Sequence, residues 1–275
     1  MGNTKTQWID LPGTKQGSLL RLFCFPYAGG SAQMFRTWQR FFPREVSLSP
    51  VHLPGRAQRI NEPPFKRLKP LVDAVTDVMI HCLPDAFAFW GHSMGALISF
   101  EVARALRRKG RSGPLALFVS GRIAPQVPDP DPPTFCLSDP EFIARLGQLN
   151  GTPKEFLAHP ELIQVFLPTI RADFELVETY MYEPEGPLAC PIYAYGGMED
   201  KDVTVDNLRA WQEQTSGKCE VRVFPGDHFF IHSSTATVIS ALSNDLLRVS
   251  PWSTNANKLP VAPGNSYPGI DLRGG

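Results

Sequence analysis

Short apolar runs alternate along the chain with longer stretches in which apolar residues recur every three or four positions. The short runs are typical of buried strands, and the longer stretches are typical of amphipathic helices. We expect strands at residues 18–25, 46–52, 87–90, 115–120, 190–197 and 219–224. We expect the helices that cover them at residues 68–83, 97–109, 205–215 and 233–247. This alternation predicts an α/β fold with a mostly parallel sheet and helices on both of its faces.

The alternation breaks between Gly121 and Pro187, where no clear strand is predicted. A Pro-rich stretch at residues 127–133 is followed by expected helices at residues 141–149, 153–157 and 160–182. This segment is too long for a simple connection and too apolar for disorder. We expect a helical lid of about residues 122–187, inserted before the late strands and covering the carboxyl ends of the sheet.

A Gly-x-Ser-x-Gly turn joins the third expected strand to the helix that follows it. Gly91, Ser93 and Gly95 occupy its three fixed positions. A turn this tight leaves no room for side chains two positions before and two positions after the serine, and glycine meets that requirement. Strand, turn and helix together indicate a nucleophile elbow with Ser93 as the nucleophile. The alternative is an ordinary strand-to-helix connection with a buried serine.

A serine hydroxyl is a weak nucleophile near neutral pH, so it needs a histidine base that is itself oriented by a carboxylate. In folds with an elbow, the acid and then the histidine follow the serine, each beyond a later strand. Four of the six histidines precede Ser93 or lie on the expected lid: His52, His81, His92 and His159. His228 directly follows the last strand and is the predicted base. His232 lies in or near the final helix and is expected to be structural.

Three carboxyl groups follow the strand that ends at Gly197: Glu199, Asp200 and Asp202. We predict that Asp200 is the acid, because the Gly-x-x-Asp spacing projects its carboxylate just past the strand end. The other two are expected to face solvent and to cap the next helix. A minority alternative takes the acid from the Pro-rich stretch, at Asp129 or Asp131.

Two backbone N–H groups are placed to stabilise a developing oxyanion. Met94 follows the nucleophile at the start of the elbow helix, and Ala28 lies in the glycine-bearing loop after the first strand. In hydrolases with an elbow, N–H groups at these two places point toward the reacting carbonyl. The sequence contains no dinucleotide fingerprint, phosphate-binding loop or metal-ligand spacing, so we expect chemistry without a cofactor or a metal.

Composition indicates which partners and which cellular compartment to expect. The 275 residues carry 27 basic and 27 acidic side chains, so no net charge attracts nucleic acid or an anionic membrane. The polar amino terminus and five scattered cysteines predict a cytosolic protein with reduced thiols. We expect a monomer with one domain over residues 1–250 and a disordered tail at residues 251–275. Arg56 and Arg59, in a Pro-Gly loop, are expected at the solvated surface.

Five motifs occur together within residues 20 to 245. They are Phe25-Pro-Tyr-Ala-Gly-Gly-Ser31, Leu53-Pro-Gly-Arg56, Gly91-His-Ser-Met-Gly-Ala96, Arg171-Ala-Asp-Phe174 and Gly226-Asp-His-Phe-Phe230. This set resembles the external, type II thioesterases that accompany nonribosomal peptide synthetases and polyketide synthases. The elbow motif alone recurs among other hydrolases, whereas its combination with the first and fourth motifs is specific to that family.

The resemblance implies an α/β-hydrolase fold and an editing enzyme. Its substrates would be stalled or wrongly primed acyl groups on the phosphopantetheine arm of acyl or peptidyl carrier proteins. The resemblance also implies Ser93, Asp200 and His228 as the triad and Asp173 as a lid-orienting residue. Candidate acyl contacts in the lid are Phe142, Leu146, Phe156, Leu162, Phe166 and Phe174. The alternatives are a free-standing esterase or lipase acting on small esters, and a non-catalytic binding protein with a hydrolase fold.

Overall fold

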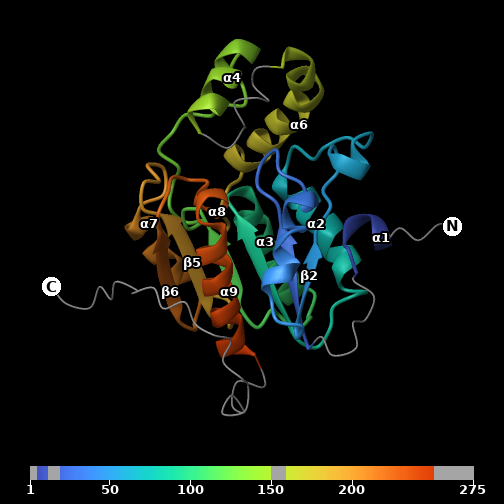
Figure 1. Cartoon of the computed structure of the whole chain (residues 1–275), viewed down its shortest axis with the longest axis vertical. Helices are drawn as coiled ribbons and strands as arrows, with labels where there is room; N and C mark the ends of the chain where they lie inside the picture. Colours follow the sequence, from blue (N-terminus) through green and yellow to red (C-terminus); the bar gives the residue numbers. More distant parts are fainter. Residues whose placement is uncertain (1–4, 12–18, 150–158, 251–275) are drawn as a thin grey trace.

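The computed structural model describes residues 5–11, 19–149 and 159–250 of the chain. Within them, six strands form one parallel sheet in the order β2-β1-β3-β4-β5-β6 (Figure 1). The strands are β1 (Leu20–Phe25), β2 (Val46–Pro50), β3 (Phe87–His92), β4 (Leu117–Ser120), β5 (Ile192–Gly197) and β6 (Cys219–Phe224). The predicted parallel sheet is confirmed. Because all six strands run the same way, their carboxyl ends meet at one edge.

Alternate residues of each strand face opposite layers of the fold. In β1, Phe23 and Phe25 belong to the apolar cluster on one face of the sheet, whereas Leu22 and Cys24 belong to the cluster on the other face. A strand that is buried on both faces needs apolar side chains at successive positions. This requirement explains why the strands appear in the sequence as continuous apolar runs.

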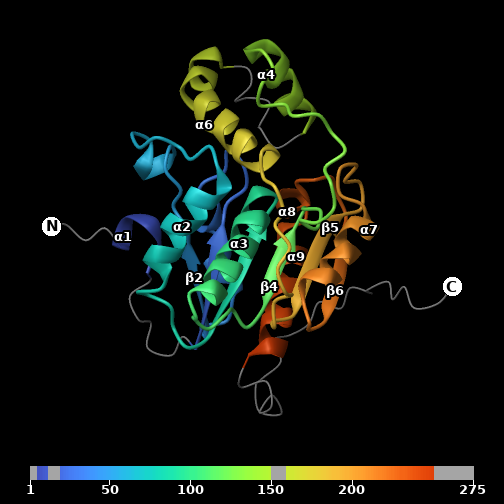
Figure 2. The same ribbon diagram turned by 180° about the vertical axis from the view of Figure 1, so that it is seen from behind.

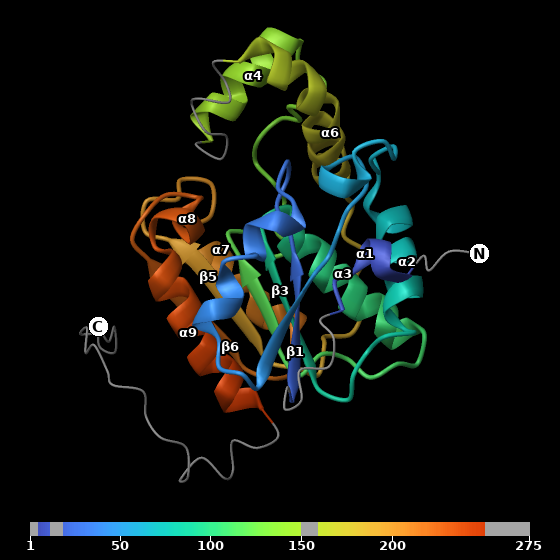
Figure 3. The ribbon, with the colours of Figure 1, turned by 45° about the vertical axis from the view of Figure 1, so that its right-hand side comes forward.

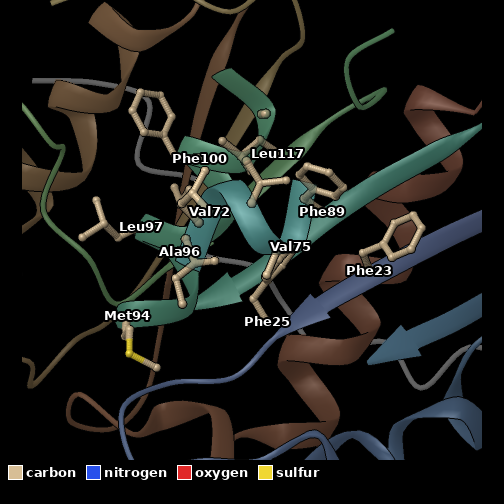
Figure 4. Packing of buried hydrophobic residues seen from close by; sticks show 14 of the residues in the cluster. Phe23, Phe25, Val72, Val75, Phe89, Met94, Ala96, Leu97, Phe100 and Leu117 are labelled. Atoms are coloured by element: carbon tan, nitrogen blue, oxygen red, sulfur yellow. The ribbon is translucent and has the colours of Figure 1, made fainter. Parts of the chain in front are cut away.

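Helices cover both faces, as predicted. On one face lie α2 (Leu68–Met79), α3 (Met94–Arg108) and α7 (Val205–Arg209), with α1 (Lys5–Trp8) beside α2 (Figure 2). Val75, Phe89 and Leu97 pack between these helices and the sheet (Figure 4). On the other face lie α8 (Phe230–Ser233), α9 (Thr235–Val249) and two 3-10 segments, Ala32–Phe35 and Trp38–Phe41. The three-layer arrangement leaves the carboxyl edge of the sheet as the place for a site.

Two expected helices are divided in the structure. The helix expected at residues 205–215 consists of α7 and a 3-10 segment, Ala210–Gln214. Trp211 in that segment is fully buried, and its Nε1–H donates to the carbonyl oxygen of Arg122 at 2.9 Å. The helix expected at residues 233–247 is divided near Ser234, whose hydroxyl donates to the carbonyl oxygen of Pro225 at 2.8 Å. Each of these contacts lies at or next to the point where the helix is divided.

The helices α4 (Asp139–Gln148) and α6 (Pro160–Glu178) stand beyond the carboxyl ends of the strands, where the lid was expected (Figure 3). We call these two helices the cap. They pack on each other through Phe142, Leu146, Ile163, Leu167 and Ile170, which form an apolar cluster separate from the two at the sheet. The helix expected at residues 153–157 and the tail at residues 251–275 lie outside the described residues.

Candidate active site

Ser93 stands at the tip of the turn between β3 and α3, with φ of 51°. This left-handed conformation is unusual for a residue with a side chain, and close packing around the turn maintains it. A Cβ atom at Gly91 would lie 2.1 Å from the carbonyl oxygen of Gly95, and one at Gly95 would lie 2.2 Å from that of Phe25. The N–H of Ser93 donates to the carbonyl oxygen of Ser120 at 2.7 Å, which ties the turn to the end of β4.

His228 and Asp200 come together from the loops after β6 and β5. Nδ1 of His228 lies 2.8 Å from Oδ2 of Asp200, whose side chain is only 1% exposed. An ionised carboxylate only accepts, so Nδ1–H donates and Nε2 is left as the basic nitrogen. The other oxygen, Oδ1, accepts the N–H groups of Asp202 and Val203 at 3.0 and 3.1 Å. Both oxygens of Asp200 are therefore fixed by donors.

The other candidate acids do not contact His228 in this way. Glu199 and Asp202 are exposed, as expected. Neither caps α7, because Thr204 does so by accepting the N–H of Asn207 at 3.2 Å. That part of the expectation was wrong, since a threonine one residue before the helix offers a short side-chain acceptor in the favoured place.

Asp129 and Asp131 lie in the exposed Pro-rich stretch and line the same cavity as Ser93. Oδ1 of Asp129 accepts the N–H of Asp131 at 3.2 Å, and Asp131 pairs with Arg145 of α4 at 3.2 Å. These contacts lie within the Pro-rich stretch and join it to the cap helix α4.

Two further histidines lie near His228. His92 is fully buried, its Nδ1 lies 2.9 Å from the hydroxyl of Ser120, and its ring centre lies 5.1 Å from that of His228. His232, in α8, lies 3.0 Å through Nε2 from the hydroxyl of Tyr27. His92 is absent from the wall of the cavity that contains Ser93 and His228.

Ala28 and Met94 line that cavity together with Ser93 and His228. Met94 is the first residue of α3, where the N–H groups and the helix dipole favour negative charge. Ala28 lies in the loop after β1, and β1 is the strand that Gly95 packs against. Within the described residues, neither N–H donates to a protein acceptor. Both are thus available to a bound group.

The cavity has a volume of about 890 Å³. Three of the six expected acyl contacts line it: Leu146, Phe166 and Phe174. Phe142 is instead fully buried between the cap helices, with its ring centre 5.2 Å from that of Phe174. Leu162 is 44% exposed because α6 turns its neighbour Ile163 toward α4. Phe156 lies outside the described residues.

Arg56 and Arg59 are buried, so the expectation that they lie at the solvated surface was wrong. Arg56 donates through Nη1 and Nη2 to the two carboxylate oxygens of Asp173 on α6, both at 2.7 Å. Arg59 donates through Nη1 to the carbonyl oxygen of His52 at 2.7 Å and lies over the ring of Trp8. Each guanidinium can be buried because it has acceptors and an anionic or aromatic partner.

Arg122 is a cavity residue that the sequence reasoning did not select. It follows β4 by two positions and lines the cavity, and its buried Nε has no partner among the described residues. Burial lowers the pKa of its guanidinium below the ordinary value for arginine. Its position just beyond the carboxyl end of a strand was the available signal, because binding residues of parallel sheets gather there.

The fold and the elbow define a protein of the α/β-hydrolase class. The chain belongs to the thioesterase domain family, whose sequence profile matches residues 20–246. The family predicted from the motifs is confirmed.

Individual relatives agree with this assignment. The chain is similar to the gramicidin S biosynthesis protein GrsT of Aneurinibacillus migulanus, at 43% identity over 240 residues, 87% of this chain and 94% of GrsT. It is similar to the solved structure of the thioesterase RedJ from the prodiginine pathway of Streptomyces coelicolor, with a TM-score of 0.78, 38% identity and coverage of 83% and 86%. It is also similar to that of the type II thioesterase BorB from the borrelidin biosynthetic cluster, with a TM-score of 0.80, 33% identity and coverage of 89% and 100%.

The described residues lack two further features. They include no helix that is both long and apolar enough to cross a membrane. They also include no group of three or more histidine, cysteine or acidic side chains arranged to hold a metal ion.

Asp200→Asn is expected to lower kcat by about 10³–10⁴-fold, because an amide no longer holds His228 in the tautomer that leaves Nε2 basic. Asp202→Asn is the matched control and should change kcat little, since its side chain is exposed and only its N–H contacts Asp200. Steady-state kinetics of the two variants with an acyl thioester measure the difference. Equal losses, or a larger loss in Asp129→Asn, would place the acid elsewhere.

His92 makes stability depend on pH. Burial, followed by the charges of His228 and His232, lowers the pKa of His92 well below its ordinary value of 6.5. At pH values between the folded and the unfolded pKa, the unfolded chain is therefore expected to bind a proton that the folded protein does not. The contribution of His92 to the free energy of unfolding is complete above the unfolded pKa and is lost as the pH falls toward the folded one, at up to about 1.4 kcal/mol per pH unit.

Denaturant unfolding between about pH 7.5 and pH 5 measures this slope for the parent and for His92→Asn. The asparagine can keep the hydrogen bond to Ser120 but does not titrate. We expect a shallower pH dependence in the variant. Identical slopes would mean that His92 accepts its proton in the folded protein.

Proposed function

We propose that the protein is a serine thioesterase that removes acyl groups from the phosphopantetheine arm of acyl or peptidyl carrier proteins. Membership in the thioesterase family supports a thioester as the bond that is cleaved. The names of GrsT, RedJ and BorB place those relatives in the biosynthesis of gramicidin S, prodiginine and borrelidin, which supports carrier-bound acyl groups as substrates. The observation that carries the proposal is that His228, held by Asp200, lines the same cavity as Ser93, Ala28 and Met94.

In the first half of the reaction, Oγ of Ser93 attacks the thioester carbonyl while Nε2 of His228 accepts the hydroxyl proton. The negative charge that develops on the carbonyl oxygen is stabilised by the N–H groups of Ala28 and Met94. Asp200 stabilises the positive charge on His228. The C–S bond then breaks, the pantetheine thiol leaves with the proton from His228, and the acyl group remains on Ser93.

In the second half, a water molecule takes the place of the thiol. His228 accepts a proton from the water as its oxygen attacks the acyl-serine, and the same N–H groups bind the second oxyanion. The ester bond breaks, Ser93 regains its proton from His228, and the carboxylic acid is released. A thiol is a good leaving group, so the catalytic demand falls on the nucleophile and the oxyanion donors.

The cavity is large enough for more than a short acyl group. Binding sites for small molecules usually occupy about 300–1,000 Å³, and this cavity is near the upper end. Its walls include the Pro-rich stretch and apolar side chains of α6, among them Phe166, Ile170 and Phe174. We therefore assign the acyl chain to the cap side of Ser93. Removal of stalled or wrongly primed acyl groups is the role that such a site would serve in an assembly line.

A comparison of two substrates with the same acyl group tests this function. We expect a much higher kcat/KM for the acyl group on a carrier protein than for the same group on a short soluble thiol, because contacts to the arm and carrier contribute to transition-state binding. Ser93→Ala should abolish both reactions while leaving the fold intact. Equal efficiency toward both substrates would indicate a free-standing esterase, and turnover of neither would indicate a binding protein.

A further inference from the structure

We propose that Asp173 of the cap helix α6 is a positioning residue for the oxyanion donor Ala28. The proposal rests on the proposed function, because it takes Ala28 N–H as a donor to the reacting oxygen. It makes one cap helix part of the catalytic apparatus, in addition to its place in the wall of the cavity. The contacts that support it come from three segments: α6, the loop after β1 and the loop after β2.

Ala28 is the first of the two central residues in a four-residue turn. The N–H of Gly30 donates to the carbonyl oxygen of Tyr27 at 2.9 Å and closes the turn, and Gly29 has a φ of 74°. A positive φ at the third residue is the geometry of a type II turn, in which glycine is strongly favoured. The turn's own hydrogen bond uses neither central N–H. The N–H of Ala28 therefore remains free for the oxyanion, and that of Gly29 needs another acceptor.

Asp173 supplies that acceptor. Its Oδ2 accepts the N–H of Gly29 at 2.8 Å, and its two oxygens also accept the forked pair of bonds from Arg56. Nη1 of Arg56 donates in addition to the carbonyl oxygen of Gly30 at 3.2 Å. The carboxylate and the guanidinium thus hold two successive residues of the turn, immediately after Ala28. Asp173 is 2% exposed and Arg56 is 6% exposed, so water does not compete for these bonds.

The same helix also contacts the substrate cavity. Phe166, Ile170 and Phe174 are four residues apart on α6, so they share one face, and all three line the cavity. A Cβ atom at Gly29 would lie 3.1 Å from Cγ1 of Ile170, which shows how closely this face meets the turn. An acyl group that displaces α6 would displace the turn with it. Selection among acyl groups is then expected to affect kcat as well as KM.

Holding the turn requires hydrogen-bond acceptors on both carboxylate oxygens of Asp173, in addition to a side chain of this shape. A carboxylate presents acceptors on both oxygens, whereas an asparagine presents one acceptor and one N–H₂ group. In Asp173→Asn, Arg56 would therefore face the N–H₂ group in either orientation of the amide, and Gly29 would face it as well if that group replaced Oδ2. Thr169→Val is the matched control. Thr169 lies one turn earlier on α6, is also buried, and donates from Oγ1 to the carbonyl oxygen of Gly55 at 2.8 Å, which is not an atom of the turn.

The experiment measures kcat and KM for a soluble acyl thioester, and the rate of inactivation by a small fluorophosphonate, in the parent and both variants. Loss of a whole oxyanion donor costs about 10²–10³-fold, so we expect Asp173→Asn to lower both kcat and the inactivation rate by about 10–100-fold. KM should change little. The midpoint of the pH–rate profile should not move, because the His228–Asp200 pair is untouched. Thr169→Val should stay close to the parent in every measurement.

Three results would overturn the proposal. An equal loss of kcat in Thr169→Val would mean that any loosening of the cap has this effect. A change in KM alone would make Asp173 a substrate-binding residue. Unchanged kinetics in Asp173→Asn would mean that the turn holds its own shape. If Asp173→Asn does not fold, Arg56→Lys, which keeps the charge but loses the fork, must show a selective loss of kcat for the proposal to stand.

The fluorophosphonate separates this proposal from the proposed function. Its reaction needs Ser93 and the oxyanion donors but no carrier protein. Absence of turnover with carrier-bound thioesters would therefore refute the proposed function alone, while the ratio of inactivation rates would still test Asp173. Failure of the parent protein to react with the fluorophosphonate would refute both.

Discussion

The site depends on the close approach of two backbone segments, the start of α3 and the end of β1. Gly95 packs so tightly on the carbonyl group of Phe25 that even one added carbon atom would overlap it. This contact places Met94, the residue before Gly95, next to the loop that contains Ala28. It also supports the left-handed conformation of Ser93, which an isolated turn would not favour. The nucleophile and the two N–H groups are thus positioned by the same piece of packing.

The remaining groups gather at the sheet edge that contains Ser93 because the sheet is parallel. The loops after β4, β5 and β6 all begin at the same edge, and they contribute Arg122, Asp200 and His228 in that order. The cap meets this edge from the other side. Its helix α6 is joined to the body by the buried Arg56–Asp173 pair, and breaking such a pair by removing one partner typically costs about 3–5 kcal/mol. The cap is therefore joined to the body of the protein beside the cavity that both of them line.

Much of this arrangement could be predicted from the sequence because the signals are local. Strands buried on both faces give continuous apolar runs, and the elbow needs glycine at two fixed places around Ser93. The positions of Asp200 and His228 followed from strand order, and the structure puts their side chains 2.8 Å apart. Their catalytic roles remain proposals.

The parts that could not be predicted depend on distant partners. Arg56 is buried because it pairs with Asp173, which lies 117 positions later in the chain. The sequence of the Pro-Gly loop contains no signal that indicates this partner. For a similar reason, the sequence did not show which face of α6 lines the cavity. Leu162 and Phe166 both fit an apolar helical stripe, but the packing of Ile163 and Leu167 on α4 leaves Leu162 outside and directs Phe166 toward the cavity. Long-range pairing and helix rotation are properties of the assembled fold.

The most direct test of the account is to trap the acyl-enzyme. The protein is mixed rapidly with an acyl group bound to a carrier protein, quenched in acid within one turnover, and analysed as an intact chain and as peptides by mass spectrometry. The proposed serine nucleophile predicts a transient increase equal to the mass of the acyl group, located on the peptide that contains Ser93. An acyl group on another residue, such as the exposed Cys136, or hydrolysis without any covalent intermediate, would contradict it.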